Sequence, residues 1–371
     1  MASPYVAHAL PGVRALTPYQ PGKPIEEVQR ELGLSEVIKL ASNENPLGPS
    51  PAARRAIDAA LAELQLYPDG SGFRLKRTLA ARLGVAPEQI TLGNGSNEIL
   101  ELMARVFLAP GRAALFSEYA FAVYPLVTQA AGAQSLVAPA RPQDDSVPLG
   151  HDLGAFTGLL ESNVRLIFIA NPNNPTGTWL EPEALQAFLR RVPPDVLVVL
   201  DEAYHEYMDP ALRPDSLRWL KAHPNLVLTR TFSKVYGLAA LRVGYAISHP
   251  DLADLLNRAR QPFNNNSLAL AAAEAALGDD DHVRRSVANN REGMVKLSNG
   301  LEAIGLRCLP SQANFLAFDA GRPAASLYEA LLRAGVIVRP LASYGMPGYL
   351  RVTVGTAAEN DRFLEALRSA L

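Results

Sequence analysis

Residues 164–177 read VRLIFIANPNNPTG, and this stretch indicates the fold of the chain. An almost wholly apolar run is followed by a turn rich in Asn, Pro and Gly, as expected for a buried strand that ends in a polar loop. The arrangement returns at residues 196–204, VLVVLDEAY, and at residues 226–234, LVLTRTFSK. Apolar strands separated by helical stretches are typical of an open parallel sheet that is covered by helices on both faces.

The pattern extends on either side of this stretch. We predict strands at residues 89–92, 113–116, 164–170, 196–200, 226–229 and 243–247. Apolar residues at three- and four-residue spacing predict helices at residues 51–66, 97–107 and 181–191. The fold class is therefore α/β, with a large domain built on a mostly parallel sheet.

The C-terminal part has a different pattern. A helical stretch at residues 281–304 is followed by three strand-like runs, ANFLAFD, VIVRPL and YLRVTVGT, and by a closing helix, which predicts a smaller α+β domain. The opening stretch, to about residue 39, is rich in Pro at its start and lacks a strong period, so we expect it to wrap a neighbouring surface. We expect an N-terminal arm at residues 1–45, a large domain at 46–280 and a small domain at 281–371.

Composition narrows the classes of partner. The 371 residues carry 35 basic and 37 acidic side chains, a net charge of −2, so no strong field attracts nucleic acid or an anionic membrane surface. Cys308 is the single cysteine, and the six histidines are scattered, so we expect neither disulfide nor metal site. We find no secretory signal and no apolar run of about 18 residues. These features predict a cytoplasmic protein that acts on small molecules.

Residues 90–107 read ITLGNGSNEILELMARVF, a strand, a glycine turn and a helix. Free backbone N–H groups at such a helix start suit a phosphate. The pattern matches a dinucleotide fingerprint only in part, and an ordinary capped turn is an equally good interpretation.

Asp201 and Lys234 each follow a buried strand. An unpaired carboxylate at the edge of a dry pocket is unfavourable, so Asp201 calls for a cationic partner, although a helix cap or a surface acid is the alternative. A lysine in a partly apolar cleft has a lowered pKa and can attack an aldehyde, although Lys234 alone could be a surface lysine. The hydroxyls of Thr229, Thr231 and Ser233, with Arg242, suit a phosphate dianion. Pyridoxal 5′-phosphate (PLP) has the aldehyde, phosphate, ring oxygen and basic ring nitrogen that these groups require.

The motifs NPNNPTG, DEAY and TFSKVYGLAALRVGY, in this order, resemble the fold type I, aspartate-aminotransferase-like PLP enzymes of class I and II. Within this group, ASNENPLGPS, YPDGSGFRLKRTLA, YAFAVYP, GVIVRPL and LRVTVGT are similar to the histidinol-phosphate aminotransferases, and the resemblance covers nearly the whole chain. It implies transamination between L-histidinol phosphate and 2-oxoglutarate in histidine biosynthesis.

The resemblance also implies roles for residues around the cofactor. Lys234 forms the internal Schiff base and moves a proton, and Asp201 holds the proton on the pyridine nitrogen. Asn174 and Tyr204 donate hydrogen bonds to the phenolate oxygen, and Tyr119 stacks on the ring. The phosphate is bound by a group of residues at the glycine turn and around the lysine: Gly95, Ser96, Asn97, Thr231, Ser233 and Arg242.

Substrate contacts and assembly are implied in the same way. Arg351, Arg339, Tyr19 and, with a structural turn as an equal alternative, Asn45 correspond to substrate-side positions. Tyr67 corresponds to a tyrosine that reaches the partner's cofactor phosphate, so the working unit is expected to be a homodimer.

Several alternatives remain open. An aromatic-amino-acid aminotransferase and a PLP-dependent threonine-phosphate decarboxylase share Lys234, Asp201 and Arg242. A nicotinamide-dependent oxidoreductase would leave Lys234 without a role. A catalytically silent binding protein on the same fold is a further possibility, but no basic stripe for DNA is visible.

Overall fold

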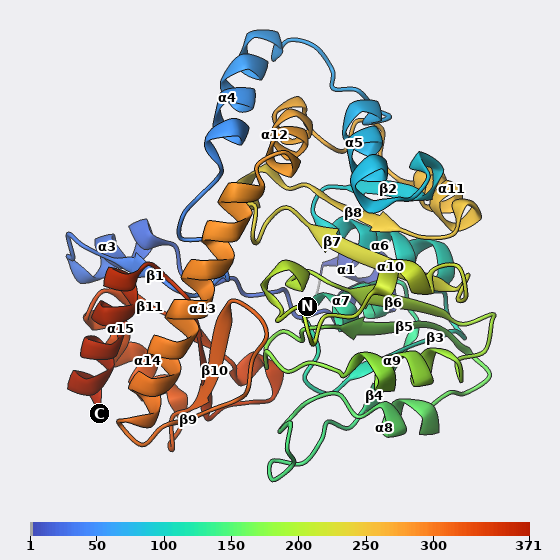
Figure 1. Cartoon of the computed structure of the whole chain (residues 1–371). Coiled ribbons are helices and arrows are strands. Elements are labelled where there is room, and N and C mark those ends of the chain that lie inside the picture. Colours follow the sequence, from blue (N-terminus) through green and yellow to red (C-terminus); the bar gives the residue numbers. More distant parts are fainter. Residues whose placement is uncertain (1–2) are drawn as a thin grey trace.

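A seven-stranded sheet organises the larger part of the computed structural model, which describes residues 3–371 (Figure 1). Its strand order is β2-β8-β7-β6-β5-β3-β4, and all strands are parallel except β8, which runs antiparallel to β2 and β7. The strands are β2 (Ile90–Gly93), β3 (Ala113–Ser117), β4 (Gln134–Ala138), β5 (Val164–Ala170), β6 (Leu197–Asp201), β7 (Leu226–Thr231) and β8 (Gly244–Ile247).

Helices cover both faces of this sheet, which explains why its central strands are apolar throughout rather than alternating. One face packs against α5 (Phe73–Leu83), α8 (Leu153–Gly158), α9 (Pro182–Leu189), α10 (Ser216–Trp219) and α12 (Ser267–Leu277). The other face packs against α6 (Ser96–Phe107), α7 (Val123–Ala130) and α11 (Pro250–Ala259). Helix α4 (Pro51–Ala60) lies on α12.

The C-terminal part forms a four-stranded antiparallel sheet in the order β12-β13-β10-β9. Its strands are β9 (Arg307–Cys308), β10 (Phe315–Asp319), β12 (Arg339–Pro340) and β13 (Tyr349–Thr353). The long helix α13 (Asp280–Glu302) leads into it from the larger part, and α14 (Ala324–Arg333) and α15 (Ala357–Ala370) contribute to the same core. In this sheet Arg339 lies directly opposite Arg351.

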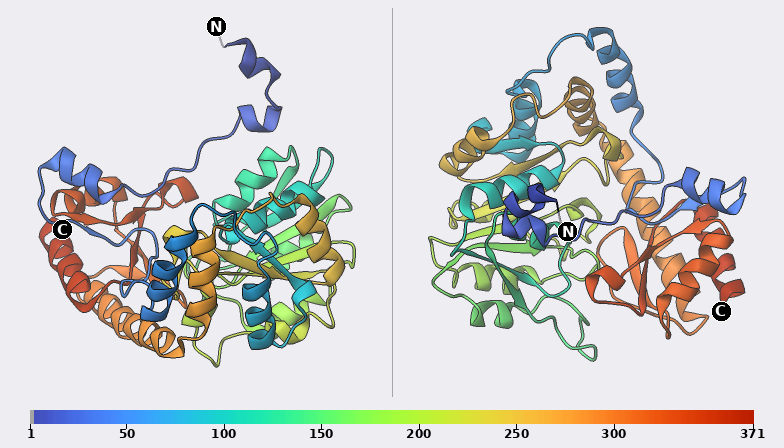
Figure 2. Two further views of the ribbon diagram at one scale, coloured as in Figure 1. Left: turned by 90° about the horizontal axis from the view of Figure 1, so that it is seen from above. Right: turned by 180° about the vertical axis from the view of Figure 1, so that it is seen from behind.

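The N-terminal segment has two different parts. Figure 2 shows α1 (Pro4–His8) and α2 (Pro11–Arg14) projecting from the body, next to α7. The following helix α3 (Ile25–Leu32) and strand β1 (Ile38–Lys39) join the smaller part, where β1 pairs with β11 (Val336–Ile337). Val28 is buried there, so the expectation that this stretch only wraps a surface is wrong for residues 25–39. The apolar spacing of Ile25 and Val28 carried that signal, whereas Leu32 is exposed.

The predicted α/β class, with a mostly parallel large sheet and a smaller α+β part, is confirmed. The six strands expected in the large sheet begin and end within two residues of the observed ones. Strand β4 was missed because its residues alternate between exposed and buried at the sheet edge and do not form an apolar run. The helix expected at 51–66 ends at Ala60 and continues as one 3-10 turn. The division into residues 1–45, 46–280 and 281–371 stays a prediction.

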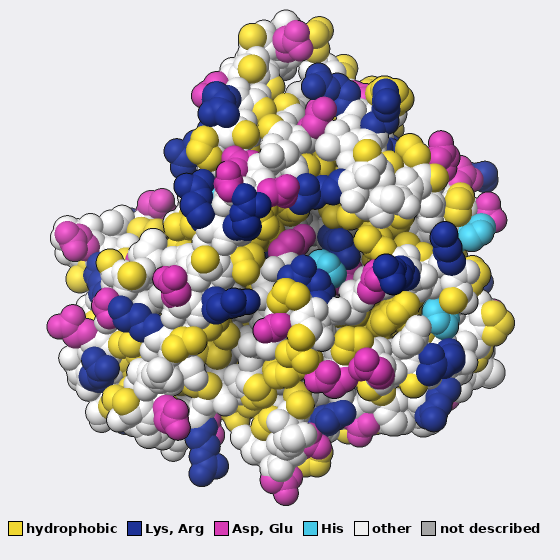
Figure 3. All heavy atoms as spheres, in the orientation of Figure 1, with side chains coloured by type: hydrophobic (Ala, Val, Ile, Leu, Met, Phe, Trp, Pro, Cys, Tyr) yellow, Lys and Arg dark blue, Asp and Glu magenta, His cyan; other side chains and the backbone are white. Residues whose placement is uncertain are grey.

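The surface carries both signs of charge. Figure 3 shows basic and acidic side chains interspersed over one face of the molecule, in keeping with the near-neutral composition. Among residues 3–371, no helix is long and apolar enough to cross a membrane.

Strands β6 and β7 are joined at their ends by a buried ion pair. Arg230 donates to the Glu202 carboxylate from Nε at 2.9 Å and approaches it from Nη2 at 2.8 Å, and the Ser216 hydroxyl donates to the other carboxylate oxygen at 2.6 Å. Although burial opposes ionisation, Arg230 and His205 lower the pKa of Glu202 to about 2. The pair therefore stays ionised at neutral pH and holds the loop that follows Asp201.

We expect Arg230→Met to lower the free energy of unfolding by about 3–5 kcal/mol at pH 7, because it leaves the Glu202 carboxylate buried without a cation. The matched control is Arg218→Met, which removes an arginine from the exposed pair with Asp215 and should change stability by less than about 0.5 kcal/mol. Urea unfolding followed by circular dichroism measures both. Equal losses in the two variants would contradict the role of the buried pair.

Candidate active site

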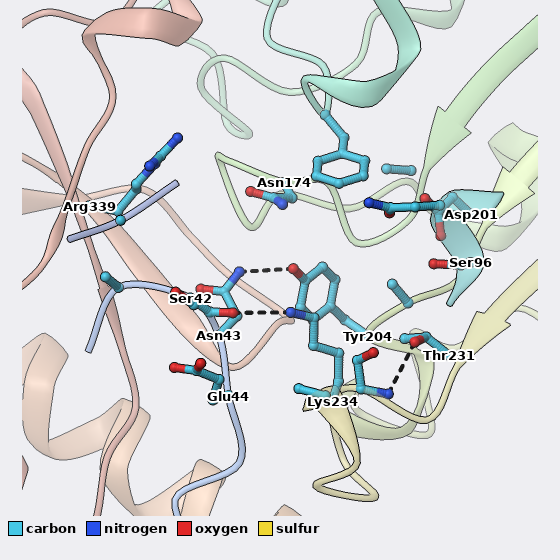
Figure 4. A pocket seen from close by; sticks show the side chains of 18 of the residues that line it. Ser42, Asn43, Glu44, Ser96, Asn174, Asp201, Tyr204, Thr231, Lys234 and Arg339 are labelled. Atoms are coloured by element: carbon cyan, nitrogen blue, oxygen red, sulfur yellow. Dashed lines mark hydrogen bonds between the residues drawn. The ribbon is translucent and has the colours of Figure 1, made fainter. Parts of the chain in front are cut away.

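A cavity of about 280 Å³ lies where the two sheets and the N-terminal segment meet (Figure 4). Strands β5, β6 and β7 point their carboxyl ends into it, as expected for a ligand site on an open parallel sheet. The residues predicted from sequence that line it are Tyr19, Ser96, Asn97, Asn174, Asp201, Tyr204, Thr231, Ser233, Lys234, Arg242, Arg339 and Arg351. The fold thus brings together groups that are far apart in the sequence.

Asp201 is buried at the end of β6 and has hydroxyl partners. Its carboxylate accepts hydrogen bonds from the Tyr124 hydroxyl at 2.9 Å and the Thr229 hydroxyl at 3.1 Å. Burial raises the pKa of Asp201 to about 6, against the effect of these hydrogen bonds. Among the described residues, no basic side chain lies within ion-pair distance of Asp201. A cation entering the cavity would therefore be stabilised by this carboxylate.

Lys234 lies in the loop after β7, with its amine inside the cavity. Its Nζ donates to the carbonyl oxygen of Ser42 at 3.1 Å and lies 5.6 Å from the centre of the Tyr204 ring. Burial, followed by the positive charge of Arg351, lowers the pKa of Lys234 to about 8. The neutral amine that a nucleophile or a base requires is thus far more populated near neutral pH than in an ordinary lysine.

Asn174 and Tyr204 line the same cavity and have partners from the smaller part and the N-terminal segment. The guanidinium of Arg351 donates to Oδ1 of Asn174 through Nη1. The Tyr204 hydroxyl accepts a hydrogen bond from Nδ2 of Asn43 at 2.8 Å. Sequence reasoning missed Asn43, although it lies within the quoted motif ASNENPLGPS, because nothing in a linear pattern indicates which asparagine of that motif faces the cavity.

The glycine turn and Arg242 form one end of the cavity. Gly95 has a positive φ of 76°, and a Cβ built on it would lie 2.4 Å from Nη2 of Arg242, so only glycine lets the guanidinium approach the backbone here. The hydroxyl of Ser233 accepts a hydrogen bond from Arg242 at 3.3 Å. Helix α6 begins at Ser96 and directs its N-terminus to the same place. This end therefore suits an anion.

Arg339 and Arg351 form the other end. Both are buried, 6% and 4% exposed, and the Nε of each has no hydrogen-bond partner within residues 3–371. Arg339 lies 5.2 Å from the centre of the Tyr19 ring, and Arg351 lies 4.9 Å from that of Phe315. No described carboxylate pairs with either arginine. Two buried cations with no acid of their own suit a second anion.

Four predicted site residues do not line the cavity. Tyr119 packs its ring beside an apolar cluster of the smaller part that includes Tyr344 and Tyr349, while Phe121, two residues along, lines the cavity. This corrects the expected stacking position of Tyr119, because packing against the smaller part turns its ring away from the cavity that Phe121 lines. Gly95 does not line the cavity itself, but its backbone lies against Arg242, which does.

Asn45 and Tyr67 have other surroundings. Asn45 donates to the Val235 carbonyl at 2.7 Å and to the Ser286 hydroxyl at 2.8 Å, so it acts as a structural link at this turn and not as a lining group. Tyr67 is 84% exposed and stacks on Phe263, with ring centres 4.9 Å apart, outside the cavity. Within this chain Tyr67 therefore touches no group of the site.

The arrangement has a chemical consequence. An anion site at each end flanks a buried carboxylate that lacks a cation and a lysine with a lowered pKa. Such a cavity can hold a ligand with an anionic arm and a cationic ring atom, and can present it to an amine that attacks carbonyl carbon or moves a proton.

Comparison with known proteins agrees with this geometry. The class I and II aminotransferase family matches residues 35–367. A histidinol-phosphate aminotransferase 2 from Pseudomonas fluorescens is 58% identical over 373 aligned residues, which cover 100% of this chain and 99% of that protein.

Solved structures agree as well. A histidinol-phosphate aminotransferase from Sinorhizobium meliloti in complex with pyridoxal-5′-phosphate superposes with a TM-score of 0.87 at 28% identity, covering 98% of this chain and 99% of that one. A Thermus thermophilus aspartate aminotransferase with maleate has a TM-score of 0.83 at 22% identity, covering 97% and 98% of the two chains. The predicted aspartate-aminotransferase-like fold is therefore confirmed.

The pKa of Asp201 leads to a test on protein stripped of bound small molecules. The folded state holds the proton up to about pH 6, and the unfolded state only up to about pH 3.9. Stability therefore falls as the pH rises through this window and stays lower above it. Asp201→Asn cannot ionise, so we expect it to be more stable than the unsubstituted protein by about 1–3 kcal/mol at pH 8 and by little at pH 4. Denaturant unfolding at both pH values measures the difference, and a difference that does not change with pH would contradict it.

Proposed function

The chain belongs to the class I and II aminotransferase family, and on this premise we propose that it is a cytoplasmic, PLP-dependent histidinol-phosphate aminotransferase. It transfers the amino group of L-histidinol phosphate to 2-oxoglutarate, which gives imidazole-acetol phosphate and L-glutamate, a step of histidine biosynthesis. Its single cysteine fits a reducing compartment.

The observation that carries the choice of substrate is the pairing of Arg339 with Arg351. They lie opposite each other on adjacent strands, both buried and without a carboxylate partner. Like charges opposite each other destabilise a sheet unless an anion lies between them. A dianionic phosphate ester satisfies both guanidinium groups in one half-reaction, and the carboxylates of 2-oxoglutarate satisfy them in the other.

The residues present fit PLP. The unpaired Asp201 carboxylate suits the protonated ring nitrogen, and the lack of a Cβ on Gly95 lets the Arg242 guanidinium lie against the glycine turn, at the end of the cavity that suits the phosphate. Ser96, Asn97, Thr231, Ser233 and Arg242 would hold the phosphate, and Asn174 and Tyr204 the ring oxygen. Phe121, rather than Tyr119, is the aromatic residue available to the ring.

When bound, PLP supplies an aldehyde that takes up the amino group and a ring that accepts the electron pair of the broken C–H bond. The chain's own groups do the rest. Lys234, neutral in part because burial lowers its pKa, would take a proton at Nζ from the substrate carbon and would deliver it to the former aldehyde carbon of PLP. Asp201 keeps a proton on its ring-nitrogen partner, and Arg339 and Arg351 orient the substrate.

We also propose that the enzyme works as a homodimer. Tyr67 and Phe263 form an exposed aromatic stack, 84% and 47% exposed, beside the exposed Leu64 and Leu66. Such a patch on a soluble protein is typical of a protein–protein interface. Tyr67 is then available to the partner's cofactor phosphate, in line with the resemblance, because it touches no site group of its own chain.

Steady-state kinetics with histidinol phosphate, phenylalanine and threonine phosphate test the substrate. We expect kcat/KM for histidinol phosphate to exceed that for phenylalanine by at least about a hundredfold, since two buried guanidiniums favour the phosphate by several kcal/mol. Arg339→Leu should raise KM for histidinol phosphate more than for phenylalanine. A higher kcat/KM for phenylalanine would favour an aromatic aminotransferase, and CO₂ release from threonine phosphate would favour the decarboxylase.

Mixing inactive variants tests the dimer. Lys234→Ala and Tyr67→Ala homodimers should each be inactive or weak, whereas a mixed dimer contains one site with an intact Lys234 and an intact partner Tyr67. We therefore expect subunit exchange to restore activity, measured as glutamate formation. Two Lys234→Ala preparations with different tags provide the control. No recovery in a confirmed mixed dimer would contradict a role for Tyr67 across the interface.

A further inference from the structure

Three consecutive residues of the N-terminal segment each contact a different group of the site. The Ala41 carbonyl accepts from Nη2 of Arg351 at 2.8 Å, the Ser42 carbonyl accepts from Nζ of Lys234 at 3.1 Å, and Asn43 donates from Nδ2 to the Tyr204 hydroxyl at 2.8 Å. Figure 4 shows Ser42 and Asn43 facing Lys234 and Tyr204 across these two hydrogen bonds. Of the three contacts, only that of Asn43 uses a side chain of the segment.

The orientation of the Asn43 amide is determined by Thr353. The backbone N–H of Asn43 donates to the Thr353 hydroxyl oxygen at 3.0 Å, so that hydroxyl is free to donate its own proton to Oδ1 of Asn43 at 3.2 Å. With Oδ1 accepting from Thr353, Nδ2 faces Tyr204. Asn314 also donates to the Asn43 carbonyl at 3.1 Å, and Asn43 is 1% exposed.

This arrangement decides what the Tyr204 hydroxyl can do. A phenol has one proton to donate, and its oxygen accepts from Asn43. Among residues 3–371, the structure shows no acceptor for the Tyr204 proton, although the side chain is buried and lines the cavity. The proton is therefore available to an oxygen atom inside the cavity.

We propose that Asn43 is a positioning residue that makes the Tyr204 hydroxyl a hydrogen-bond donor into the cavity, with its amide held in place by Thr353. The acceptor is the ring oxygen of the cofactor, so the proposal rests on the proposed function. Thr353 lies on β13, two residues from Arg351, whereas Tyr204 follows β6 of the large sheet. The hydrogen bonds from Thr353 through Asn43 to Tyr204 thus connect the strand that carries a substrate-binding arginine to the group that contacts the cofactor.

The backbone conformation of Asn43 permits substitutions that add no backbone strain. Its φ is 57°, a left-handed conformation that asparagine, aspartate and glycine adopt most readily. Asn43→Asp keeps the shape but replaces the donor with an acceptor, so it would draw the Tyr204 proton away from the cavity. Asn43→Gly removes the amide without adding charge or backbone strain. Thr353→Val removes the orienting hydroxyl, and Thr353→Ser keeps it.

The experiment compares the PLP-bound variants Asn43→Asp, Asn43→Gly, Thr353→Val and Thr353→Ser with the unsubstituted enzyme. Two quantities are measured: kcat, and the pH at which the visible absorption of the bound cofactor changes. We expect Asn43→Asp to lower kcat at least about tenfold and to raise this pH, because the cofactor oxygen loses a donor. Asn43→Gly should have a smaller effect of the same sign, and Thr353→Val should lose more activity than Thr353→Ser.

A double-mutant cycle separates this role from a structural one. Asn43→Asp is introduced into Tyr204→Phe, where there is no hydroxyl to orient, and we expect it to change kcat and the spectral pH by less than about twofold and 0.3 unit, as coupled residues do. The same loss in both backgrounds would overturn the proposal, because a charge effect or misfolding persists without the hydroxyl. So would unsubstituted behaviour of both Asn43 variants.

Failure of the proposed function would look different. An unsubstituted enzyme that binds PLP but does not transaminate histidinol phosphate contradicts the substrate, and the spectral titrations of the Asn43 variants still decide the role of Asn43. An enzyme that transaminates histidinol phosphate while its Asn43 variants titrate like the unsubstituted protein contradicts only the role of Asn43. Thermal unfolding of each variant identifies any that does not fold.

Discussion

The carboxylate of Asp201, buried at the end of β6 without a cation, is the constraint on which the rest of the site depends. A charge in this place is unfavourable by itself, and the raised pKa of Asp201 reflects that. Its two hydroxyl partners compensate only in part. The site therefore holds a carboxylate whose best partner comes from outside the chain, and the sheet, helix α7 through Tyr124, and Thr229 of β7 hold it in position.

Two cations of the cavity likewise lack a partner of opposite charge within the chain. Arg339 and Arg351 are buried on paired strands without a carboxylate, whereas Arg230 of the large sheet is buried with Glu202. The presence or absence of a carboxylate partner thus distinguishes a structural arginine from the ligand-binding arginines. Arg230 and Glu202 satisfy each other and stabilise the fold, whereas the unpaired arginines are stabilised only when an anionic ligand is present.

Much of this could be predicted from sequence because the information is local. Apolar runs followed by polar turns indicate the central strands. Because the carboxyl ends of parallel strands meet at one edge of a sheet, the sequence alone places Asp201, Asn174 and Lys234 in one site. The choice between Tyr119 and Phe121 could not be made, because both lie in one short turn and the direction of each side chain depends on packing against the smaller part. The antiparallel register that places Arg339 opposite Arg351 is likewise a property of pairing between distant segments.

The N-terminal segment illustrates why such sites are assembled from distant elements. Strand β1 pairs with β11 and so attaches the segment to the smaller part, and the Leu40 carbonyl continues this attachment by accepting from the backbone N–H of Thr353 at 2.8 Å. The next three residues then cross the cavity and contact Arg351, Lys234 and Tyr204 in turn. Because this pairing fixes the segment to the smaller part, which also carries Arg351, any displacement of the small sheet relative to the large one changes the contacts with Lys234 and Tyr204 together. Substrate that draws Arg351 toward its anion therefore acts on the same backbone that positions Lys234 and Tyr204, which connects binding at one end of the cavity to the reacting groups at its centre.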